Sequence, residues 1–600
     1  MASRTTLGAL AAALLAAGAA GAPHPPATTL TGTIVDRNGD GLLEAGPAER
    51  RVVREELAAA QSGRAGRRRE LAFLAQLTDF QLVDEESPAR VELVDRYGGS
   101  LDAAYRPQEG LLPFVADESV RRLRAARSPV DGRRLELVVA TGDNVDNTQL
   151  NETRWYLALL DGGIVDPNSG SDPGPCRVPQ PRRRYQGVRG GGSYYEPNTS
   201  RKGVDGPGYS PRRGENRRVT GRANVVRDHP GLFELMNRPF RAVGLGLPWY
   251  TVFGNHDGLI QGNVAYNPLF AQAAVGCVKP TRLSKEGLAE IRGLVAGGLT
   301  AEERSRVVQI LSRDLVETVF GPDLTRDRWI PVLRDARRKL LLRDEYMRLH
   351  FETRGRPLGH GFTPERAARG EGHYAFSPKP GLRFVVLDTV ADSGDQGNVD
   401  DAQFRWLHGE LAAAESRRDL VVVFAHHPIA SLVNAEPGTH LGSGVCPTTD
   451  PAVPPTATEP LECLLLRHHG VVALVDGHQH RNRIAAHPRT GGGGFWEIVT
   501  SAHIDWPQQS RLLDLVDNGD RTLSIFATVI DHGGPARPGK RPRRRGALLS
   551  RAEVSWLASV ARELSFNDPQ AENGRDGRAD RRGTALDRNV ELLVPSPYQR

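Results

Sequence analysis

Five continuous apolar segments, each followed at once by Asp, Asn or His, constrain the fold of this 600-residue chain more than any other feature. They are Leu71–Asp79, Leu135–Asp143, Leu247–Asp257, Leu420–Pro428 and Val471–His480. A short run that is apolar at every position predicts a strand buried on both faces, as in a sheet covered by helices. Helical patterns, such as Glu118–Arg127 and Asp400–Arg417, separate some of these runs. This alternation predicts an α/β layered fold.

Polar side chains gather where these predicted strands end. In open α/β sheets, ligands lie beyond the carboxyl ends of the strands, so we expect the five ends to meet at one edge. The set contains only Asp, Asn and His: Asp79, Asp143, Asn255, His426, His478 and His480. Carboxylate, amide and imidazole ligands suit Mn, Fe or Zn. Two ions about 3.5–4 Å apart need a shared carboxylate, and Asp143 is the predicted bridge.

Taken in order, these residues resemble the motifs of the calcineurin-like metallophosphoesterases. The matching segments are Asp79-Phe80-Gln81, Gly142-Asp143-Asn144-Val145-Asp146, Gly254-Asn255-His256-Asp257, His426-His427-Pro428 and Gly477-His478-Gln479-His480. Motif order and strand context match over about Leu71–Thr528. A finer resemblance, carried by Thr78–Glu92 and Ser501–Arg511, is to an exported actinobacterial-type subgroup with no assigned substrate.

The resemblance implies an α/β fold built as a two-layer β-sandwich flanked by helices, here with a helical insertion. It also implies two divalent metal ions (Mn, Fe or Zn) and hydrolysis of phosphomonoesters or phosphodiesters by a metal-bound hydroxide. By position, Asp79, Asp143 and His480 would hold one metal. The other metal would be held by Asp143, Asn255, His426 and His478.

The resemblance also suggests roles for residues around the metals. His256 would donate a proton to the leaving oxygen, and Asp146 would orient its imidazole. Three residues are expected to line the substrate pocket or to pack beside it: His503, Asp505 and Arg511. His427 is expected either to pack beside the ligands or to support one of them.

One position departs from the family pattern. The first motif normally ends in His, and here that place holds Gln81. An amide oxygen binds divalent transition metals less well than imidazole does, so the first metal is expected to be weaker or exchangeable. Gln81 is one candidate ligand at this place, and Asp84 is a possible substitute.

The chain is expected to divide into several segments. Residues 1–22 have a basic start, a short apolar run and small residues at the end, which predicts a secretory signal peptide. An N-terminal extension (23–70) would precede the catalytic domain (71–532), which carries insertions at about 160–245 and 280–355. A basic linker (533–546) and a C-terminal segment that docks on the core (547–600) would follow. No later segment is apolar enough to span a membrane.

Four cysteines in an exported chain predict two disulfides. The favoured pair is Cys446–Cys463, because the two residues flank a loop rich in Pro and Thr.

Three functions are compatible with these features. An exported phosphoesterase acting on a small phosphoester is preferred. A net charge of +6 and Arg-rich segments allow a nuclease, although only 6% of the residues are aromatic, which leaves few platforms for stacking bases. A metal-binding protein with impaired catalysis is the third, because of Gln81. The oligomeric state is not predicted.

Overall fold

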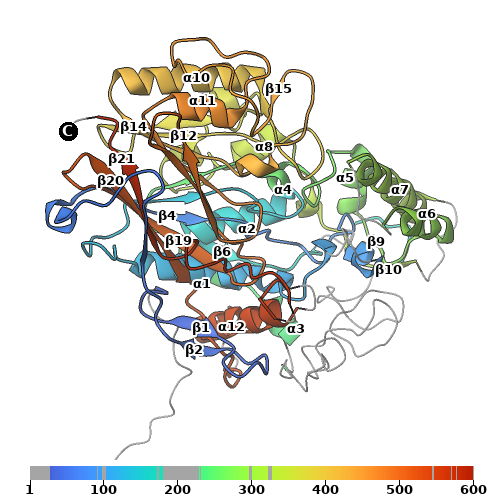
Figure 1. Ribbon diagram of the computed structural model, residues 1–600. Coiled ribbons are helices and arrows are strands. Elements are labelled where there is room, and N and C mark those ends of the chain that lie inside the picture. Colours follow the sequence, from blue (N-terminus) through green and yellow to red (C-terminus); the bar gives the residue numbers. More distant parts are fainter. Residues whose placement is uncertain are drawn as a thin grey trace, which may run out of the picture.

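The computed structural model describes residues 28–90, 92–97, 103–171, 174–179, 229, 232–295, 301–321, 328–543, 546–568, 571–575 and 577–598. The predicted signal peptide and the Arg-rich segment Arg182–Arg218 lie outside the described residues. In the described part of the chain, two large sheets are surrounded by helices (Figure 1). The predicted α/β class is therefore confirmed.

The first sheet has seven strands. In spatial order they are β3 (Val52–Arg54), β21 (Val590–Pro595), β20 (Thr522–Asp531), β19 (Gln509–Asp517), β4 (Arg69–Leu77), β5 (Leu137–Ala140) and β8 (Trp249–Thr251). β4, β5 and β8 run parallel to one another, whereas β19 and β20 form a long antiparallel pair. The parallel part contains three of the five predicted strands.

The second sheet has six strands. In spatial order they are β11 (Tyr374–Phe376), β12 (Leu382–Val386), β14 (Leu420–Phe424), β16 (Val471–Asp476), β18 (Gly494–Val499) and β17 (Arg483–Pro488). β12, β14, β16 and β18 are parallel. β14 and β16 are the other two predicted strands.

The side chains of the second sheet alternate between two hydrophobic clusters. On β14, Val422 and Phe424 join the large central cluster, which also contains residues of the first sheet such as Phe73 and Val138. The intervening Val421 and Val423 pack with α10 (Asp401–Ser416) and α11 (Leu461–Arg467). This period of two is what a strand buried on both faces requires. The two sheets thus share one core, with helices outside it.

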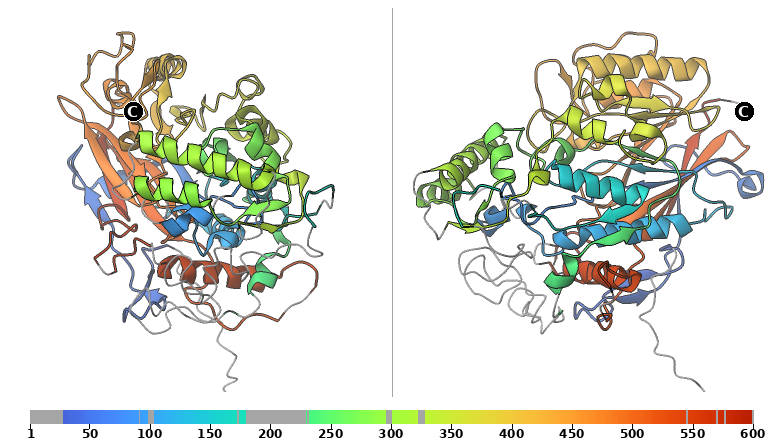
Figure 2. Two further views of the ribbon diagram at one scale, coloured as in Figure 1. Left: turned by 90° about the vertical axis from the view of Figure 1, so that its right-hand side faces the viewer. Right: turned by 180° about the vertical axis from the view of Figure 1, so that it is seen from behind.

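Helices on the opposite side of the molecule complete the layers. α1 (Leu112–Ala125), α2 (Leu150–Asp161) and α12 (Arg551–Asn567) contribute to the central cluster and lie away from α10 and α11 (Figures 1 and 2). α12 begins with a capping box in which Ser550 and Glu553 satisfy each other's backbone N–H groups.

Smaller elements connect these layers. They are β1 (Thr33–Val35), β2 (Glu44–Gly46), β6 (Gly163–Val165), α3 (Leu232–Met236), β7 (Phe240–Ala242), α4 (Asn255–Gly258), α8 (Arg343–Leu349), α9 (Pro364–Ala367), β13 (Val399–Asp400) and β15 (Thr439–His440).

The terminal segments belong to the sheet rather than preceding or following it. β3, in the predicted N-terminal extension, pairs with β21, in the predicted C-terminal segment, and β21 pairs with β20. Strands therefore pair across the expected boundaries at residues 70 and 547. The first part of the predicted linker is also packed, since Arg562 donates hydrogen bonds to the carbonyls of Gly534 and Pro535.

Residues 268–331, which overlap the insertion predicted at about 280–355, form a side lobe. It consists of α5 (Pro268–Ala274), β9 (Val278–Pro280), α6 (Lys285–Val295), α7 (Ala301–Phe320) and β10 (Trp329–Pro331). The helices stand to one side of the sheets in Figure 1 and face the viewer in the left view of Figure 2. A hydrophobic cluster holds the lobe together, and it includes Phe270, Val278, Leu315 and Trp329.

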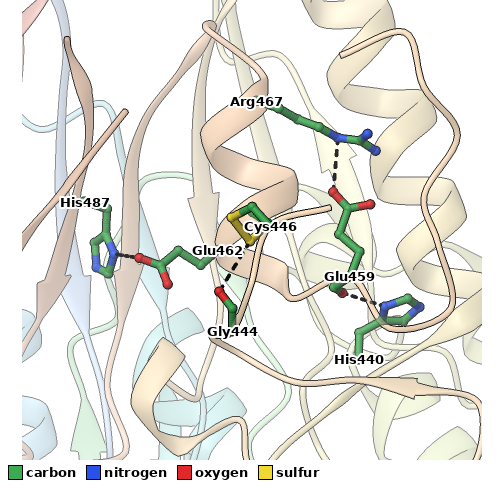
Figure 3. Close-up of a disulfide and its surroundings, with 8 residues drawn as sticks. His440, Gly444, Cys446, Glu459, Glu462, Arg467 and His487 are labelled. Atoms are coloured by element: carbon green, nitrogen blue, oxygen red, sulfur yellow. Dashed lines mark hydrogen bonds and ion pairs between the residues drawn. A yellow bond between two sulfur atoms is a disulfide. The ribbon is translucent and has the colours of Figure 1, made fainter. Parts of the chain in front are cut away.

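All four cysteines are paired. Cys176–Cys277 ties the segment after β6 to the side lobe. Cys446–Cys463, the pair favoured from the sequence, is confirmed and joins a loop to α11 (Figure 3). Cross-links of this kind persist in oxidising compartments. Of the helices that the structure describes, none combines the length and the apolar character needed to cross a membrane.

The contacts of His487, which lies next to this second disulfide, should make the stability of the protein depend on pH. Its Nδ1 lies 2.7 Å from Glu462 Oε1 (Figure 3), and its Nε2 lies 3.4 Å from Glu497 Oε2. Burial opposes the imidazolium, but the two carboxylates outweigh it and raise the pKa of His487 to about 9. The stabilisation is complete below the unfolded pKa, near 6.5, and is lost as the pH rises through about 9.

We therefore expect His487→Gln to lower the free energy of unfolding by about 2–3 kcal/mol at pH 6. The deficit relative to wild type should shrink by pH 10, where the native imidazole is neutral as well. Urea unfolding midpoints of both proteins at the two pH values provide the measurement. An equal deficit at pH 6 and pH 10 would show that only packing on Phe495 was lost.

Candidate metal centre

The predicted ligands share an unusual backbone conformation. Five of the predicted ligand positions have positive φ values: Asp79 (50°), Gln81 (45°), Asp143 (53°), His478 (63°) and His480 (54°). Such a conformation costs about 1–3 kcal/mol per residue and persists only where the surrounding structure imposes it, most often at functional sites. These residues lie two to four positions beyond the ends of β4, β5 and β16, where the chain turns sharply to present a side chain.

The ligands come from both sheets. β4, β5 and β8 of the first sheet end before Asp79, Asp143 and Asn255, whereas β14 and β16 of the second sheet end before the histidines. The expectation of a single sheet edge is therefore wrong: two sheets converge. Gln76 links them, since its Nε2 donates to the Asp476 carbonyl at 2.7 Å. His478 N likewise donates to Asp79 Oδ2 at 3.1 Å.

Asp143, Asn255 and His426 form the first group of predicted ligands. His426 Nδ1 donates to the Thr141 carbonyl at 2.8 Å, which fixes the tautomer. His426 Nε2 then faces Asn255 Oδ1 at 2.9 Å and Asp143 Oδ2 at 3.2 Å. Asn255 is oriented by its amide nitrogen, which donates to the Gly262 carbonyl at 3.0 Å. Three ligating atoms are thus turned toward one point.

Asp79 and His480 form the second group. His480 Nε2 lies 3.3 Å from Asp79 Oδ1, and its Nδ1 lies 2.7 Å from Asp505 Oδ2. A carboxylate behind a histidine is the usual support of a metal-binding imidazole, because it fixes the tautomer and raises the basicity of the ligand. Asp505, expected in the substrate pocket, instead holds His480.

His478 and His427 differ although they are neighbours. Their ring centroids lie 4.3 Å apart, and the ring centroid of His478 lies 5.2 Å from that of His426. His427 uses both nitrogens, with Nδ1 at 2.8 Å from Thr389 Oγ1 and Nε2 at 3.1 Å from the Asp395 carbonyl. This places His427 in a packing role. Burial first, and then the cationic His426, lower the pKa of His478 to about 4, which leaves its lone pair free for a metal.

The charges of the centre suit bound cations. Burial disfavours an ionised Asp143, but His426 and His256 outweigh it and hold the pKa of this carboxyl well below its usual range. Burial likewise opposes a charged His426, yet the Asp143 and Asp79 carboxylates raise its pKa to about 9. Protons on the imidazoles thus neutralise the carboxylates here, as cations would.

The buried oxygens also fit a metal. Gln81 Oε1 is buried without a hydrogen-bond partner, and buried Asp79 Oδ1 is in an ion pair with His480 Nε2 at 3.3 Å. Ligand atoms of Asp79, Asp143 and His426 all lie within 4.8 Å of one another. Because a buried polar atom without a partner is costly, the donor set fits a divalent cation.

His256 is held by the residue expected to orient it. Its Nδ1 lies 3.1 Å from the Asp146 carbonyl and 3.3 Å from Asp146 Oδ1, whereas its Nε2 lies 3.9 Å from Asp143 Oδ2. Burial lowers the pKa of His256, but Asp143 and Asp146 raise it more, so the net shift is upward. His256 therefore presents an N–H group to the predicted bridge without needing a metal contact.

Several supporting residues were not anticipated from the sequence. Buried Arg90 pairs with Asp146 and, at 2.6 Å, with Glu109. Arg106 and Arg581 pair with Asp505 behind His480. No local pattern marks an arginine as the partner of an acid far away in the sequence, so only the tertiary structure reveals these contacts.

Two residues expected near the substrate are part of the core. His503 is fully buried, with Nδ1 bonded to the Thr78 carbonyl and Nε2 to Ser510 Oγ. Arg511 is also fully buried and donates to Thr500, Asn482 and three backbone carbonyls. Their hydrogen-bonding atoms are occupied by the fold, so we assign neither to the pocket.

The glycines of the motifs permit close approaches between the ligand loops. A Cβ on Gly142, where φ is 92°, would lie 2.6 Å from His426 Nδ1. A Cβ on Gly254 would overlap the backbone nitrogen and carboxylate of Asp143. Asp257 completes this junction, since its carboxylate accepts hydrogen bonds from Asn144 N and Gly254 N at 2.9 Å each.

The structure distinguishes between Gln81 and Asp84, the two candidates for the ligand position that the first motif normally fills with His. Gln81 Nε2 donates to Asp143 Oδ2 at 3.3 Å, and its side chain lines the site. The Asp84 carboxylate is bound by other residues: it pairs with buried Arg338 at 3.3 Å and accepts hydrogen bonds from Asn151 and Ser169. Asp84 is therefore not a substitute ligand, and Gln81 remains the candidate.

We expect Gln81→His to increase metal retention. An imidazole binds Mn, Fe or Zn more tightly than an amide oxygen does, so the metal affinity of the weaker site should rise by about 10-fold or more, and this site should keep more of its metal during dialysis. Elemental analysis of wild type and variant after the same dialysis provides the measurement. His487→Gln is the control, because His487 is not among the residues that line the site. An unchanged occupancy would mean that residue 81 does not reach the metal.

The ligands open into a cavity of about 320 Å³. Gln81, Asp143, Asn255, His256, His478 and His480 line one part of it. Arg106 and Asp146 lie in the same lining, as do apolar residues of the side lobe. The centre is therefore accessible to a small molecule.

Comparison with known proteins yields limited similarity. No family model matches the chain. Two sphingomyelin phosphodiesterases, from Bos taurus and Homo sapiens, are each 42% identical over 69 residues, which is 10% of this chain. The match spans only 11% of the length of these curated relatives. A dimetal phosphatase from Danio rerio aligns over 77% of this chain and 100% of its own, at 12% identity and a TM-score of 0.30, too low to establish a common fold.

Proposed function

We propose that this protein is a metal-dependent phosphoesterase with two divalent cations, Mn, Fe or Zn. One observation carries the proposal: ligating side chains from five strand ends of two sheets converge, and five of the predicted ligands are held in a strained backbone conformation. The local similarity to proteins named phosphodiesterases supports the same chemistry. The assignment of Asp79, Gln81 and His480 to one cation, and of Asn255, His426 and His478 to the other, with Asp143 shared, belongs to this proposal.

The residues of the chain have separate tasks. Two cations, when bound, lower the pKa of water and neutralise charge on phosphate oxygens. Asp143 supplies the shared anionic ligand, and Asp505 and Thr141 keep His480 and His426 in the ligating tautomer. His256, oriented by Asp146, donates a proton to the leaving oxygen. Arg90 in turn keeps Asp146 ionised and in place.

We also propose that the protein is exported and that the predicted signal peptide directs it. The two disulfides support this location, because such cross-links are rare where thiols are kept reduced.

The test combines metal analysis with a substrate panel. The purified protein should contain two equivalents of metal and should hydrolyse 4-nitrophenyl phosphate, bis(4-nitrophenyl) phosphate, or both. Chelation should abolish turnover, and re-addition of Mn, Fe or Zn should restore it.

Other results would replace the proposal. Two tightly held metals without turnover of any ester would indicate a metal-binding protein with impaired catalysis. Turnover confined to long DNA, falling steeply as salt rises, would indicate a nuclease, because phosphate contacts release counterions.

A further inference from the structure

We infer that the phosphoester substrate carries a hydrocarbon group, which binds against the side lobe next to the metal centre. This inference rests on the proposed phosphoesterase function and narrows its substrate class to amphiphilic phosphoesters. It is drawn from the composition of the cavity wall.

One wall of the cavity is apolar, in contrast to the part of the lining that the predicted metal ligands form. Six of the residues that line the cavity are large aliphatic or aromatic ones: Ile260, Val264, Phe270, Val307, Val308 and Leu311. Phe270 comes from α5 and the last three from α7, so the side lobe supplies four of these six residues, and the strands that carry the ligands supply none. One cavity therefore combines an anion-binding centre with an apolar surface.

The wall is built and supported. Ile260, Phe270, Leu315 and Val319 belong to one hydrophobic cluster, and the Cys176–Cys277 disulfide lies in the same cluster. Val308 and Leu311 are only partly buried, whereas Val307, Ile310, Leu315 and Val319 of the same helix are buried. Apolar side chains kept partly open beside a charged centre lose hydrophobic stabilisation unless a ligand covers them.

A small polar phosphoester would leave this wall in contact with water. A hydrocarbon chain attached to the phosphate would cover this wall. Each methylene transferred from water to such a surface increases the binding constant by at most about fourfold. The phosphate oxygens would meanwhile lie near the ligands of the centre and near Arg106. The cavity thus fits an ester with a charged head and an apolar tail.

Two series of substrates test this inference. Alkyl 4-nitrophenyl phosphates, from methyl to hexyl, keep one leaving group and vary the retained chain. Alkyl phosphate monoesters of the same lengths, followed by phosphate release, place the chain on the leaving side. We expect kcat/KM to rise by about twofold to fourfold per methylene in at least one series. Six carbons or fewer keep the esters monomeric in solution.

Variants of α7 locate the effect. Val308→Thr and Leu311→Asn have nearly the same shape as the native residues but are polar, so they should reduce the gain per methylene. Val316→Thr is the matched control, because Val316 is half-buried on the same helix and does not line the cavity. This control should keep the wild-type dependence on chain length.

The outcomes separate this inference from the function on which it rests. Absence of turnover of every ester, including the methyl esters, would overturn the phosphoesterase proposal itself. Turnover with no dependence on chain length in both series would leave the function standing and overturn the hydrocarbon site; the wall would then only exclude water. A gain that Val308→Thr and Leu311→Asn leave unchanged would also overturn it, since the chain would then bind elsewhere.

Discussion

Asp143→Asn is expected to empty the metal centre and abolish turnover. Asp143 contacts His426 through one carboxylate oxygen, at 3.2 Å, and the His256 backbone through the other, at 2.8 Å. The amide keeps the shape of this side chain but removes the anionic charge that two cations would share. Loss of a residue that merely supports a ligand costs about 10–100-fold, so loss of the shared ligand should cost more than about 100-fold in kcat/KM.

Elemental analysis and turnover of bis(4-nitrophenyl) phosphate would be measured on the same preparation. Asp531→Asn is the matched control: Asp531 is a buried carboxyl on β20 that accepts a hydrogen bond from Gln509, and burial raises its pKa. The control should retain both metals. Two tightly held metals in Asp143→Asn would show that this residue does not bridge them.

His256→Ala is expected to keep the metals and lose rate. The His256 ring is held by Asp146, and its Nε2 lies 3.9 Å from Asp143 Oδ2. Because His256 is not one of the predicted ligands, its loss should leave the cations bound. Removal of a general acid should lower kcat by about 10²–10⁴-fold for alkyl esters, whose leaving alkoxide needs a proton. The loss should be much smaller for a nitrophenyl ester, because nitrophenolate departs without one.

Asn255→Ala provides the contrast at the adjacent position. It removes an oxygen ligand, so it should lose metal and recover part of its activity when excess metal is supplied. A uniform loss of rate across leaving groups in His256→Ala would argue for an electrostatic role instead of proton donation. Loss of metal from that variant would make His256 a ligand.

The sequence alone determined the elements that depend on local pattern. Continuous, mainly apolar runs predict strands buried on both faces, and all five were found as β4, β5, β8, β14 and β16. The polar residues that follow them could be listed because a chain leaving a buried strand must turn at once, and their type identified metal chemistry. The Cys446–Cys463 pair followed from the loop that it closes.

Only the tertiary structure shows which strands and side chains lie next to one another. The five strands belong to two sheets. The sequence could not show this division, because a mainly apolar run carries no information about which strands lie beside it. Asp505, His503 and Arg511 follow one another closely in the sequence, yet one supports a ligand and two are buried in the core. Residue type could not separate them, because a polar side chain acquires its role from the partner that compensates its burial.

The same limit applies to the wall of the cavity. Val308 and Leu311 read as ordinary positions of an amphipathic helix in an insertion, and nothing in their spacing points to a site. They become part of the cavity only because the side lobe packs beside the strand ends. Ligand type is set by local chemistry, which the sequence carries, whereas the shape of the pocket arises from contacts between distant segments, which only folding brings together.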